Sequence, residues 1–347
     1  MKTNAGRFFE EYCVGDVIQH AVPRTLSGGE RALYHALYPA RGALYSSDAF
    51  AQACGLPASP LDDLIVFHTV FGKTVPDISL NAVANLGYAE GRFLKPVYPG
   101  DTLRSSSEVI GLKQNSNGKS GVVYVRTTGT NQRGEPVLEY VRWVMVRKRD
   151  LDAPAPDTVL PELAKVVAPG DLIVPEGLNF EQYDFAQAGE AYRLGDYAIG
   201  EVIEHVDGVT VEEAEHMLAT RLWQNTAKVH YDATFRPDGK RLIYGGHIIS
   251  LARALSFNGL ANAQMIVAIN GGAHANPCHS GMTVRAWSEV LDTAQTDVPG
   301  VGAIRLRLVA TSGTGAGTKM ATELRGEDGK YRPEVLLDLD YWALMPI

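Results

Sequence analysis

Two stretches of this chain repeat each other at nearly constant separation. The segment PVYPGDTLRSSSEV, Pro96 to Val109, recurs as PCHSGMTVRAWSEV, Pro277 to Val290, with Pro, Gly, Thr, Arg, Ser, Glu and Val at identical offsets. Upstream, EYCVGDVIQH, Glu11 to His20, recurs as DYAIGEVIEH, Asp196 to His205. A repeat that keeps the order of two separate motifs indicates a duplicated and fused folding unit. We therefore expect two copies of one fold, and polar chemistry held by only one copy should mark the working site.

The length of the chain agrees with this duplication. Its 347 residues are enough for two cores of about 150 residues each. Between the repeats, LDAPAPDT and VAPGDLIVPEG cluster prolines that discourage helix and central strand. The predicted organisation is an N-terminal repeat over 1–150, a proline-rich linker over 151–187 and a C-terminal repeat over 188–347.

Composition restricts the class of protein. The net charge of −8 argues against a general nucleic-acid binder, and no run approaches the roughly 18 apolar residues needed to span a bilayer. The N-terminus lacks the apolar centre of a signal peptide. The 3 cysteines are widely spaced and odd in number, which argues against a disulfide framework. We expect a cytoplasmic protein without nucleic-acid or membrane partners.

Each half is predicted to contain two helices followed by long strands. Thr210-Val-Glu-Glu is expected to open a helix whose buried face includes Met217, Leu218, Leu222 and Trp223. A second, more apolar helix should begin at Gly245-Gly246. Alternating residues around Leu306 and Leu339 predict antiparallel sheet with one wet face. One buried helix against a curved antiparallel sheet in each half is an α+β arrangement.

Subtracting one half from the other indicates the candidate site. Alignment through the repeated EYCVGDVIQH block places Ala40 on Asn225 and Tyr45 on His230, so the first half lacks this polar pair. A histidine can exchange a proton near neutral pH. Free backbone N–H groups at the start of a helix can hold a developing oxyanion, and Gly246 lies there.

These residues resemble the motif of the MaoC-like (hydratase 2) enoyl-coenzyme A (CoA) hydratases of the hotdog fold, in their fused double-hotdog form. The family motif has Asp, His five residues later, an acidic residue two further on, and a Gly-led helix. This chain has Asn225, His230, Asp232 and Gly246 in those places, and PGDTL at Pro99 to Leu103.

The resemblance implies a tandem hotdog, in which each repeat is a curved antiparallel sheet around a central helix and the first repeat is catalytically silent. It implies syn addition of water to a 2-enoyl-CoA thioester, with no metal or redox cofactor. The run QNTAKVH and the overall length are most similar to family members that act on mesaconyl-CoA. We also expect that the chain can work as a monomer or form a homo-oligomer.

One position departs from the family pattern. Asn225 stands where the family usually has Asp, and an amide cannot take up a proton. The principal acid or base would then be His230, with Asn225 orienting the water, or with Asp232 or Glu215 supplying a carboxylate. Mesaconyl-CoA carries a free carboxylate near the reacting carbons, so an Asn there would avoid charge repulsion.

A diacid substrate also needs a cationic partner, and an arginine would suit its carboxylate best. The sequence does not choose among the nearby candidates Arg221, Lys228, His247 and His279. For the CoA phosphates and adenine, the basic residues considered are Arg236, Lys240 and Arg241.

Other motifs have simpler interpretations. The segment from His274 to His279 has no partner motif for zinc, and His68 on an apolar helix is expected to be a core residue with both nitrogens bonded. GTGAGT, Gly313 to Thr318, is predicted to be a hairpin turn. Two other functions remain open: a general (R)-specific hydratase of uncharged 2-enoyl-CoA chains, and a non-catalytic acyl-thioester binding protein.

Overall fold

The computed structural model describes residues 2–313 and 322–347. Its strands form one ten-stranded antiparallel sheet in the order β1-β3-β4-β5-β2-β7-β10-β9-β8-β6. The strands are β1 (Val17–Thr25), β2 (Ala82–Phe93), β3 (Thr102–Gln114), β4 (Ser120–Thr130), β5 (Pro136–Arg147), β6 (Val202–Thr210), β7 (Ile266–His274), β8 (Thr283–Gln295), β9 (Val301–Ser312) and β10 (Val335–Pro346). Each half contributes five strands in the same relative order, as a duplicated unit requires.

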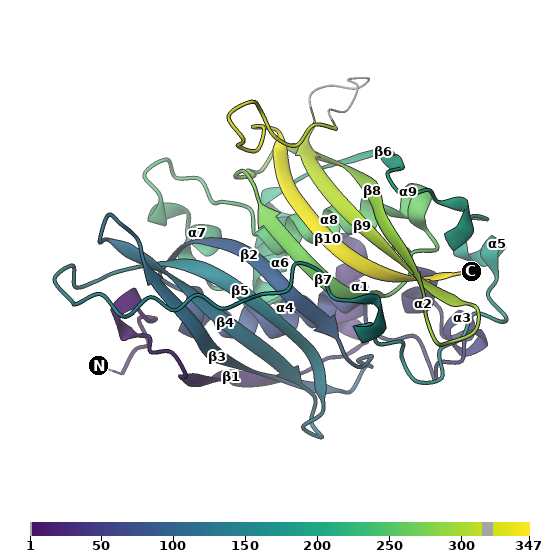
Figure 1. Ribbon diagram of the computed structural model, residues 1–347, viewed down its shortest axis with the longest axis horizontal. Coiled ribbons are helices and arrows are strands. Elements are labelled where there is room, and N and C mark those ends of the chain that lie inside the picture. Colours follow the sequence, from purple (N-terminus) through teal and green to yellow (C-terminus); the bar gives the residue numbers. More distant parts are fainter. Residues whose placement is uncertain (1, 314–321) are drawn as a thin grey trace.

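The long helices lie together on one face of this sheet (Figure 1). The helices are α1 (Gly28–Leu37), α2 (Ala43–Ser46), α3 (Asp48–Ala53), α4 (Asp63–Thr74), α5 (Phe185–Ala188), α6 (Glu213–Leu222), α7 (Lys228–Tyr231), α8 (Gly245–Leu255) and α9 (Phe257–Leu260). Helix α4 packs on β1, β3 and β5, and α8 packs on β6, β8, β9 and β10. A central helix wrapped by an antiparallel sheet, occurring twice, confirms the predicted α+β tandem hotdog.

Burial explains why these segments form central helices. All of α4 is buried, as is most of α8, and each buried Leu, Ile, Val or Phe side chain contributes roughly 1.5–3 kcal/mol through removal from water. Helix α4 begins after Asp62, whose carboxylate accepts a hydrogen bond from the backbone N–H of Leu64 at 2.9 Å. A π-helical turn (Val75–Ser79) that contains a proline follows its last residue.

The two halves join at the middle of the sheet and between the central helices. Strand β2 pairs with β7, with Gly91 opposite Ile269. Between the helices, the Nδ1 atom of His68 lies 3.3 Å from the Tyr244 hydroxyl and its Nε2 atom lies 2.7 Å from Ser250 Oγ. The prediction of a core histidine with both ring nitrogens bonded is confirmed.

The proline-rich segment between the halves runs from the first half to the second. Val159 forms an isolated antiparallel bridge with Leu112 of β3. Further along, the backbone N–H of Val167 donates to Asn270 Oδ1 at 2.8 Å, and its carbonyl accepts from Trp342 Nε1 at 3.2 Å. The segment is therefore fixed to both halves of the sheet by specific hydrogen bonds.

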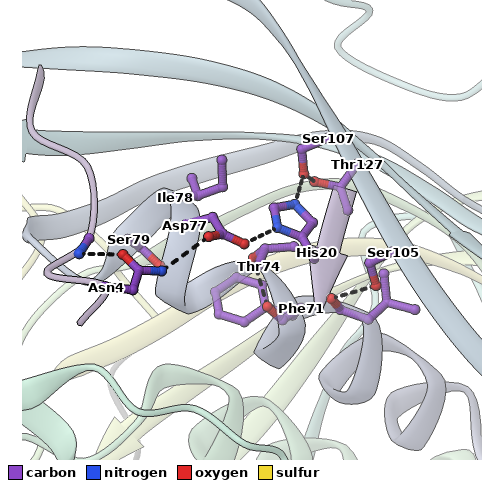
Figure 2. A network of polar contacts seen from close by, with 12 residues as sticks. Asn4, His20, Phe71, Thr74, Asp77, Ile78, Ser79, Ser105, Ser107 and Thr127 are labelled. Atoms are coloured by element: carbon purple, nitrogen blue, oxygen red, sulfur yellow. Dashed lines mark hydrogen bonds and ion pairs between the residues drawn. The ribbon is translucent and has the colours of Figure 1, made fainter. Parts of the chain in front are cut away.

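A serine, a histidine and an aspartate lie in one hydrogen-bonded chain in the first half (Figure 2). His20 contacts Asp77 through Nδ1 and Ser107 Oγ through Nε2, each at 2.8 Å. The second half repeats this contact with His205 and Ser288 at 2.8 Å, using a backbone carbonyl in place of the acid. Both serines are buried. Because both halves keep the pair, we interpret it as a structural link between neighbouring strands, not as a nucleophile and its base.

Two local predictions need comment. Thr210 does not open α6: it ends β6, its hydroxyl lies 2.9 Å from that of Thr283, and the N-cap residue Glu212 makes no side-chain cap. The capping prediction was wrong because strand pairing takes up Thr210. The turn predicted at Gly313–Thr318 lies outside the described residues except for Gly313. Among the described residues, no helix is long and apolar enough to cross a membrane.

Candidate active site

Asn225 and His230 lie on the segment that leaves α6, and the first half supports this segment. Helix α4 approaches it so closely that a Cβ atom on Gly72 would lie 1.7 Å from the carbonyl oxygen of Trp223. Only glycine permits that approach. The first half thus contributes to the site by holding the backbone just before Asn225.

The tautomer of His230 follows from its hydrogen bond. Its Nδ1 atom lies 2.8 Å from the carbonyl oxygen of Leu242. Because a carbonyl only accepts, Nδ1 carries the proton and Nε2 presents a lone pair. Burial lowers the pKa of His230, against a smaller opposite effect of the Leu242 hydrogen bond. The side chain is therefore neutral at pH 7 and can act as a base.

The start of α8 differs from the start of α4 in a way that favours catalysis. Its N-cap residue, Tyr244, makes no side-chain hydrogen bond to the helix end. Within the part of the chain that the structure describes, the N–H of Gly246 has no hydrogen-bond acceptor. At the matching place in the first half, Asp62 accepts from the N–H of Leu64. A capped end cannot receive another anion, whereas the free end of α8 can hold an oxyanion.

Two glycines are needed at this helix start because aromatic rings lie against it. A Cβ atom on Gly245 would lie 2.4 Å from the His274 ring, and one on Gly246 would lie 2.4 Å from the Tyr244 ring. The Tyr244 ring is also 5.8 Å from the His230 ring, measured between centroids. The backbone of Gly246 and the imidazole of His230 therefore lie on either side of one aromatic ring.

His216 is a member of the site that the sequence analysis missed. Its Nε2 atom accepts a hydrogen bond from the backbone N–H of Tyr244 at 2.9 Å, so its Nδ1 atom carries the proton. That Nδ1 atom is buried and has no partner among the described residues. The His216 ring lies 6.3 Å from that of His230 and 6.1 Å from that of His247. His216 thus holds the turn before α8 and has a free donor inside the site.

The sequence carried a signal for His216. The buried residues of α6 are His216, Ala219, Thr220 and Leu222, which follows i, i+3, i+4 spacing. The buried face of α6 is therefore shifted by about one residue from the face predicted with Met217 and Leu218. The prediction gave weight to these apolar side chains and did not count the histidine as a buried residue.

Asn225 is buried and oriented by its own loop. Its Oδ1 atom accepts from the N–H of Ala227 at 3.2 Å, and its backbone N–H donates to the Thr220 carbonyl at 2.9 Å. With the oxygen engaged, the side-chain NH₂ group faces its surroundings as a donor. This arrangement suits a group that positions a water molecule or binds an anionic oxygen.

Neither nearby carboxylate supplies the missing acid. Asp232 is exposed and its Oδ1 atom accepts from the N–H and hydroxyl of Thr234, at 2.9 and 2.7 Å. Glu215 is also exposed. Among the described residues, no Asp or Glu forms a hydrogen bond or ion pair with His230. The part in proton transfer predicted for Asp232 does not fit this position, where it caps a short 3₁₀ turn.

Of the four candidates for the cationic partner, His247 alone among the described residues is buried, and its ring lies beside that of His216. Arg221 and Lys228 are exposed, and Arg221 Nε donates to the Met217 carbonyl of its own helix. His279 Nδ1 contacts the carbonyl of Arg241 at 3.1 Å.

His247 is fully buried, with Nδ1 3.1 Å from the Tyr38 hydroxyl and Nε2 unpartnered in the described residues. Burial lowers the pKa of His247 to about 4. It is therefore a neutral hydrogen-bonding group and not the cation that a diacid requires.

The basic residues considered for the coenzyme lie between α7 and α8 in the sequence. Arg236 forms an ion pair with Asp238 at 2.7 Å, and Arg241 forms one with Glu213. Lys240 is exposed. In the described residues, no group of three or more His, Cys, Asp or Glu side chains is placed to hold a metal ion.

The matching site in the first half is occupied by the protein's own side chains. Tyr45, the counterpart of His230, donates to Asp63, whose Oδ2 atom also accepts from the N–H of Ile266 at 2.7 Å. Burial raises the pKa of Asp63 to about 8. A small cavity of about 30 Å³ lies here beside Arg253. The first half therefore keeps the shape of a site but lacks its histidine and its free helix end.

The fold and the site together define a MaoC-like double-hotdog protein. The solved structure of a MaoC domain dehydratase from Chloroflexus aurantiacus superposes with a TM-score of 0.95 at 56% identity over 100% of this chain and 99% of that chain. A double-hotdog protein from Mycobacterium tuberculosis superposes with a TM-score of 0.76 at 25% identity over 98% of each chain.

The family model described as mesaconyl-CoA hydratase matches residues 2–317, and the chain belongs to this family. It is 75% identical to mesaconyl-CoA hydratase of Cereibacter sphaeroides over 100% of both chains. It is 57% identical to beta-methylmalyl-CoA dehydratase of Chloroflexus aurantiacus over 99% of this chain and 98% of the relative.

Proposed function

We propose that this protein is a hydro-lyase that reversibly adds water to mesaconyl-CoA and forms β-methylmalyl-CoA. The names of its two relatives describe the two directions of that reaction. The structural observation that carries the proposal is the uncapped start of α8 beside a neutral His230. The N–H of Gly246 can stabilise the enolate oxygen of the thioester, and the free Nε2 atom of His230 can take a proton from water.

The proposed steps balance in atoms and charge. His230 Nε2 removes a proton from a water molecule that Asn225 orients through its side-chain NH₂ group. The hydroxide adds to the carbon that carries the free carboxylate, and the thioester becomes an enolate held by Gly246. The protonated His230 then returns its proton to the carbon next to the thioester, on the same face, which gives syn addition.

An amide at position 225 fits a charged substrate. An aspartate about 4 Å from the substrate carboxylate would repel it by roughly 4 kcal/mol at an effective dielectric constant near 20. Asn225 avoids this repulsion and keeps a hydrogen-bond donor. A general hydratase of uncharged chains would not need the exchange, which favours the diacid.

We further propose that the first half acts without chemistry of its own and that the enzyme works in the cytoplasm on an acyl-CoA thioester, without nucleic-acid or membrane partners. The pairing of β2 with β7 already joins the two hotdogs within one chain, so one chain can form the complete site. Assembly into a homo-oligomer remains an expectation.

The proposal is tested by following the enoyl-thioester absorbance with mesaconyl-CoA and with crotonyl-CoA, for the wild type and a His230→Ala variant. We expect rapid loss of the band with mesaconyl-CoA and a fall of about 10²- to 10⁴-fold in kcat for the variant, as for loss of a general base. His35→Ala, on α1 outside the site, is the matched control.

The results would separate the alternatives. Preference for crotonyl-CoA would identify a general hydratase. Absence of reaction with either substrate, with retained binding, would identify an acyl-thioester binding protein. Full activity in His230→Ala would contradict the assignment of the base.

A further inference from the structure

Arg142 carries a buried positive charge that has no ion-pair partner within the part of the chain that the structure describes. It lies on the inward face of β5, where the neighbours Leu138, Tyr140, Val144 and Val146 are all buried, and its own side chain is 0% exposed. Its Nη2 atom donates to Thr74 Oγ1 at 2.7 Å. In the described residues, its Nε and Nη1 atoms have no hydrogen-bond partner and its guanidinium forms no ion pair. Such burial is costly unless an anion is received there.

The second half contains a half-buried arginine whose hydrogen bonds are made within the protein. Arg253 of α8 donates to Ser256 Oγ at 2.8 Å and to the Gln264 carbonyl at 3.0 Å. Its guanidinium also faces the ring of Tyr341 of β10 at 5.9 Å. Arg253 thus donates hydrogen bonds to acceptors in its own half, whereas the Nε and Nη1 atoms of Arg142 have no acceptor among the described residues.

The two arginines occupy exchanged places in the repeat. In the second half the arginine is on the helix and the aromatic ring on the strand. In the first half Phe71 is on the helix, and the guanidinium of Arg142 on the strand lies 4.3 Å from its ring centroid. Each central helix therefore meets the sheet through a cation–π contact, but only the Arg142 contact contains an arginine with unmet donors.

A series of aromatic rings connects Arg142 to the candidate active site. The ring of Phe71 lies 6.0 Å from that of Tyr244, which in turn lies 5.8 Å from that of His230. Burial raises the pKa of Tyr244, and the charge of Arg142 acts in the opposite direction on the same hydroxyl. One aromatic ring, that of Phe71, thus stands between the guanidinium and the site.

We propose that Arg142, supplied by the silent first half, binds the free carboxylate of the substrate's acyl chain. This inference rests on the proposed function. The face of the Phe71 ring, which carries partial negative charge, covers the guanidinium in the unliganded protein, and the substrate carboxylate displaces it. The planar guanidinium then meets both carboxylate oxygens with the donors that are now unpaired. Tyr140 on the same strand face offers a further unpartnered hydroxyl in the described residues.

The test compares charged and uncharged substrates in Arg142→Met, which keeps much of the volume and removes the charge. We expect kcat/KM for mesaconyl-CoA to fall about 100-fold, as for loss of a charged hydrogen-bonded partner. The value for crotonyl-CoA should change less than about threefold. Arg142→Lys keeps the charge without the fork and should fall between these results.

Arg253→Met is the matched control, because it removes a half-buried arginine from the equivalent cation–π contact. It should leave the ratio of the two kcat/KM values unchanged, even where it lowers stability. A measurement that needs no turnover is inhibition by saturated thioesters: Arg142→Met should weaken inhibition by succinyl-CoA about 100-fold and leave inhibition by butyryl-CoA unchanged.

An unchanged substrate ratio and unchanged succinyl-CoA inhibition in Arg142→Met would overturn the inference and make Arg142 a structural residue. The proposed function has a separate test, since it fails only if the wild type does not hydrate mesaconyl-CoA. If Arg142→Met does not fold, the Arg142→Lys variant provides the test. An unchanged ratio of the kcat/KM values for mesaconyl-CoA and crotonyl-CoA in that variant would exclude bidentate recognition of the carboxylate.

Discussion

The buried histidines make the stability of this protein sensitive to mild acid. Burial lowers the pKa of five side chains far below the usual value of about 6.5. These are His68 and His216, to about 3, and His205, His247 and His274, to about 4. Below pH 6.5 the unfolded chain takes up protons that the native protein excludes, so the free energy of unfolding falls as the pH falls.

The size of the effect follows from the linkage relation. Between pH 7.5 and 5.5, each of these histidines lowers the free energy of unfolding by about 1.4 kcal/mol, and the five together lower it by about 7 kcal/mol. The result depends little on the individual values because all of them lie well below 5.5. Asp63 opposes the change, since burial raises its pKa to about 8 and the native protein holds that proton. Its contribution of about 2.5 kcal/mol leaves a net loss of about 4 kcal/mol.

Urea unfolding measured at pH 7.5 and 5.5 checks this expectation. A loss of about 4 kcal/mol is a large part of a typical total stability of 5–15 kcal/mol. In Asp63→Asn, which keeps an oxygen to accept from Tyr45 and Ile266, the opposing effect is removed and the loss should grow to about 7 kcal/mol. A wild-type stability that changes by less than about 1 kcal/mol, or an equal loss in both proteins, would refute the reasoning.

Two further predictions concern the site. Gly246→Ala should lower kcat for mesaconyl-CoA about 10²- to 10³-fold, because the new Cβ atom would lie 2.4 Å from the Tyr244 ring and displace an oxyanion donor. Gly28→Ala, where a Cβ atom meets open space at the start of α1, should keep full activity in the same assay. Asn225→Asp should lower kcat/KM for mesaconyl-CoA but not for crotonyl-CoA, because the added charge repels the substrate carboxylate by roughly 4 kcal/mol; improved turnover of mesaconyl-CoA would contradict this.

The sequence was sufficient to predict the features that can be recognised by comparing its two repeats. The repeat predicted two equivalent units, and the Gly245-Gly246 pair marked the start of α8 as the structure has it. Subtraction of the halves selected Asn225 and His230, which lie together in the second half. The first two predictions succeeded because each depends on local pattern or on repetition within the chain, whereas the roles of Asn225 and His230 remain predictions.

The features that the sequence did not predict depend on contacts between distant segments. His216 is hydrogen-bonded to the backbone of Tyr244, 28 residues away, and Arg142 contacts the ring of Phe71 on another element. A signal for Arg142 existed, since a charged residue stands at an inward position of an alternating strand. The strand pattern alone could not show whether an acid lies opposite, because the partner comes from the tertiary packing.

The two helix starts offer a physical reason for the proposed confinement of the reaction to one half of the duplicated fold. In the first half Asp62 caps α4, and a cap of this kind stabilises a protein by about 1 kcal/mol. The same bond occupies the N–H that could otherwise hold an oxyanion. In the second half α8 lacks the side-chain cap and leaves Gly246 free for substrate. Since one N–H cannot serve both purposes, a half that gains the cap loses its reaction, and it is then free to supply other groups, such as Arg142, to the site of its partner.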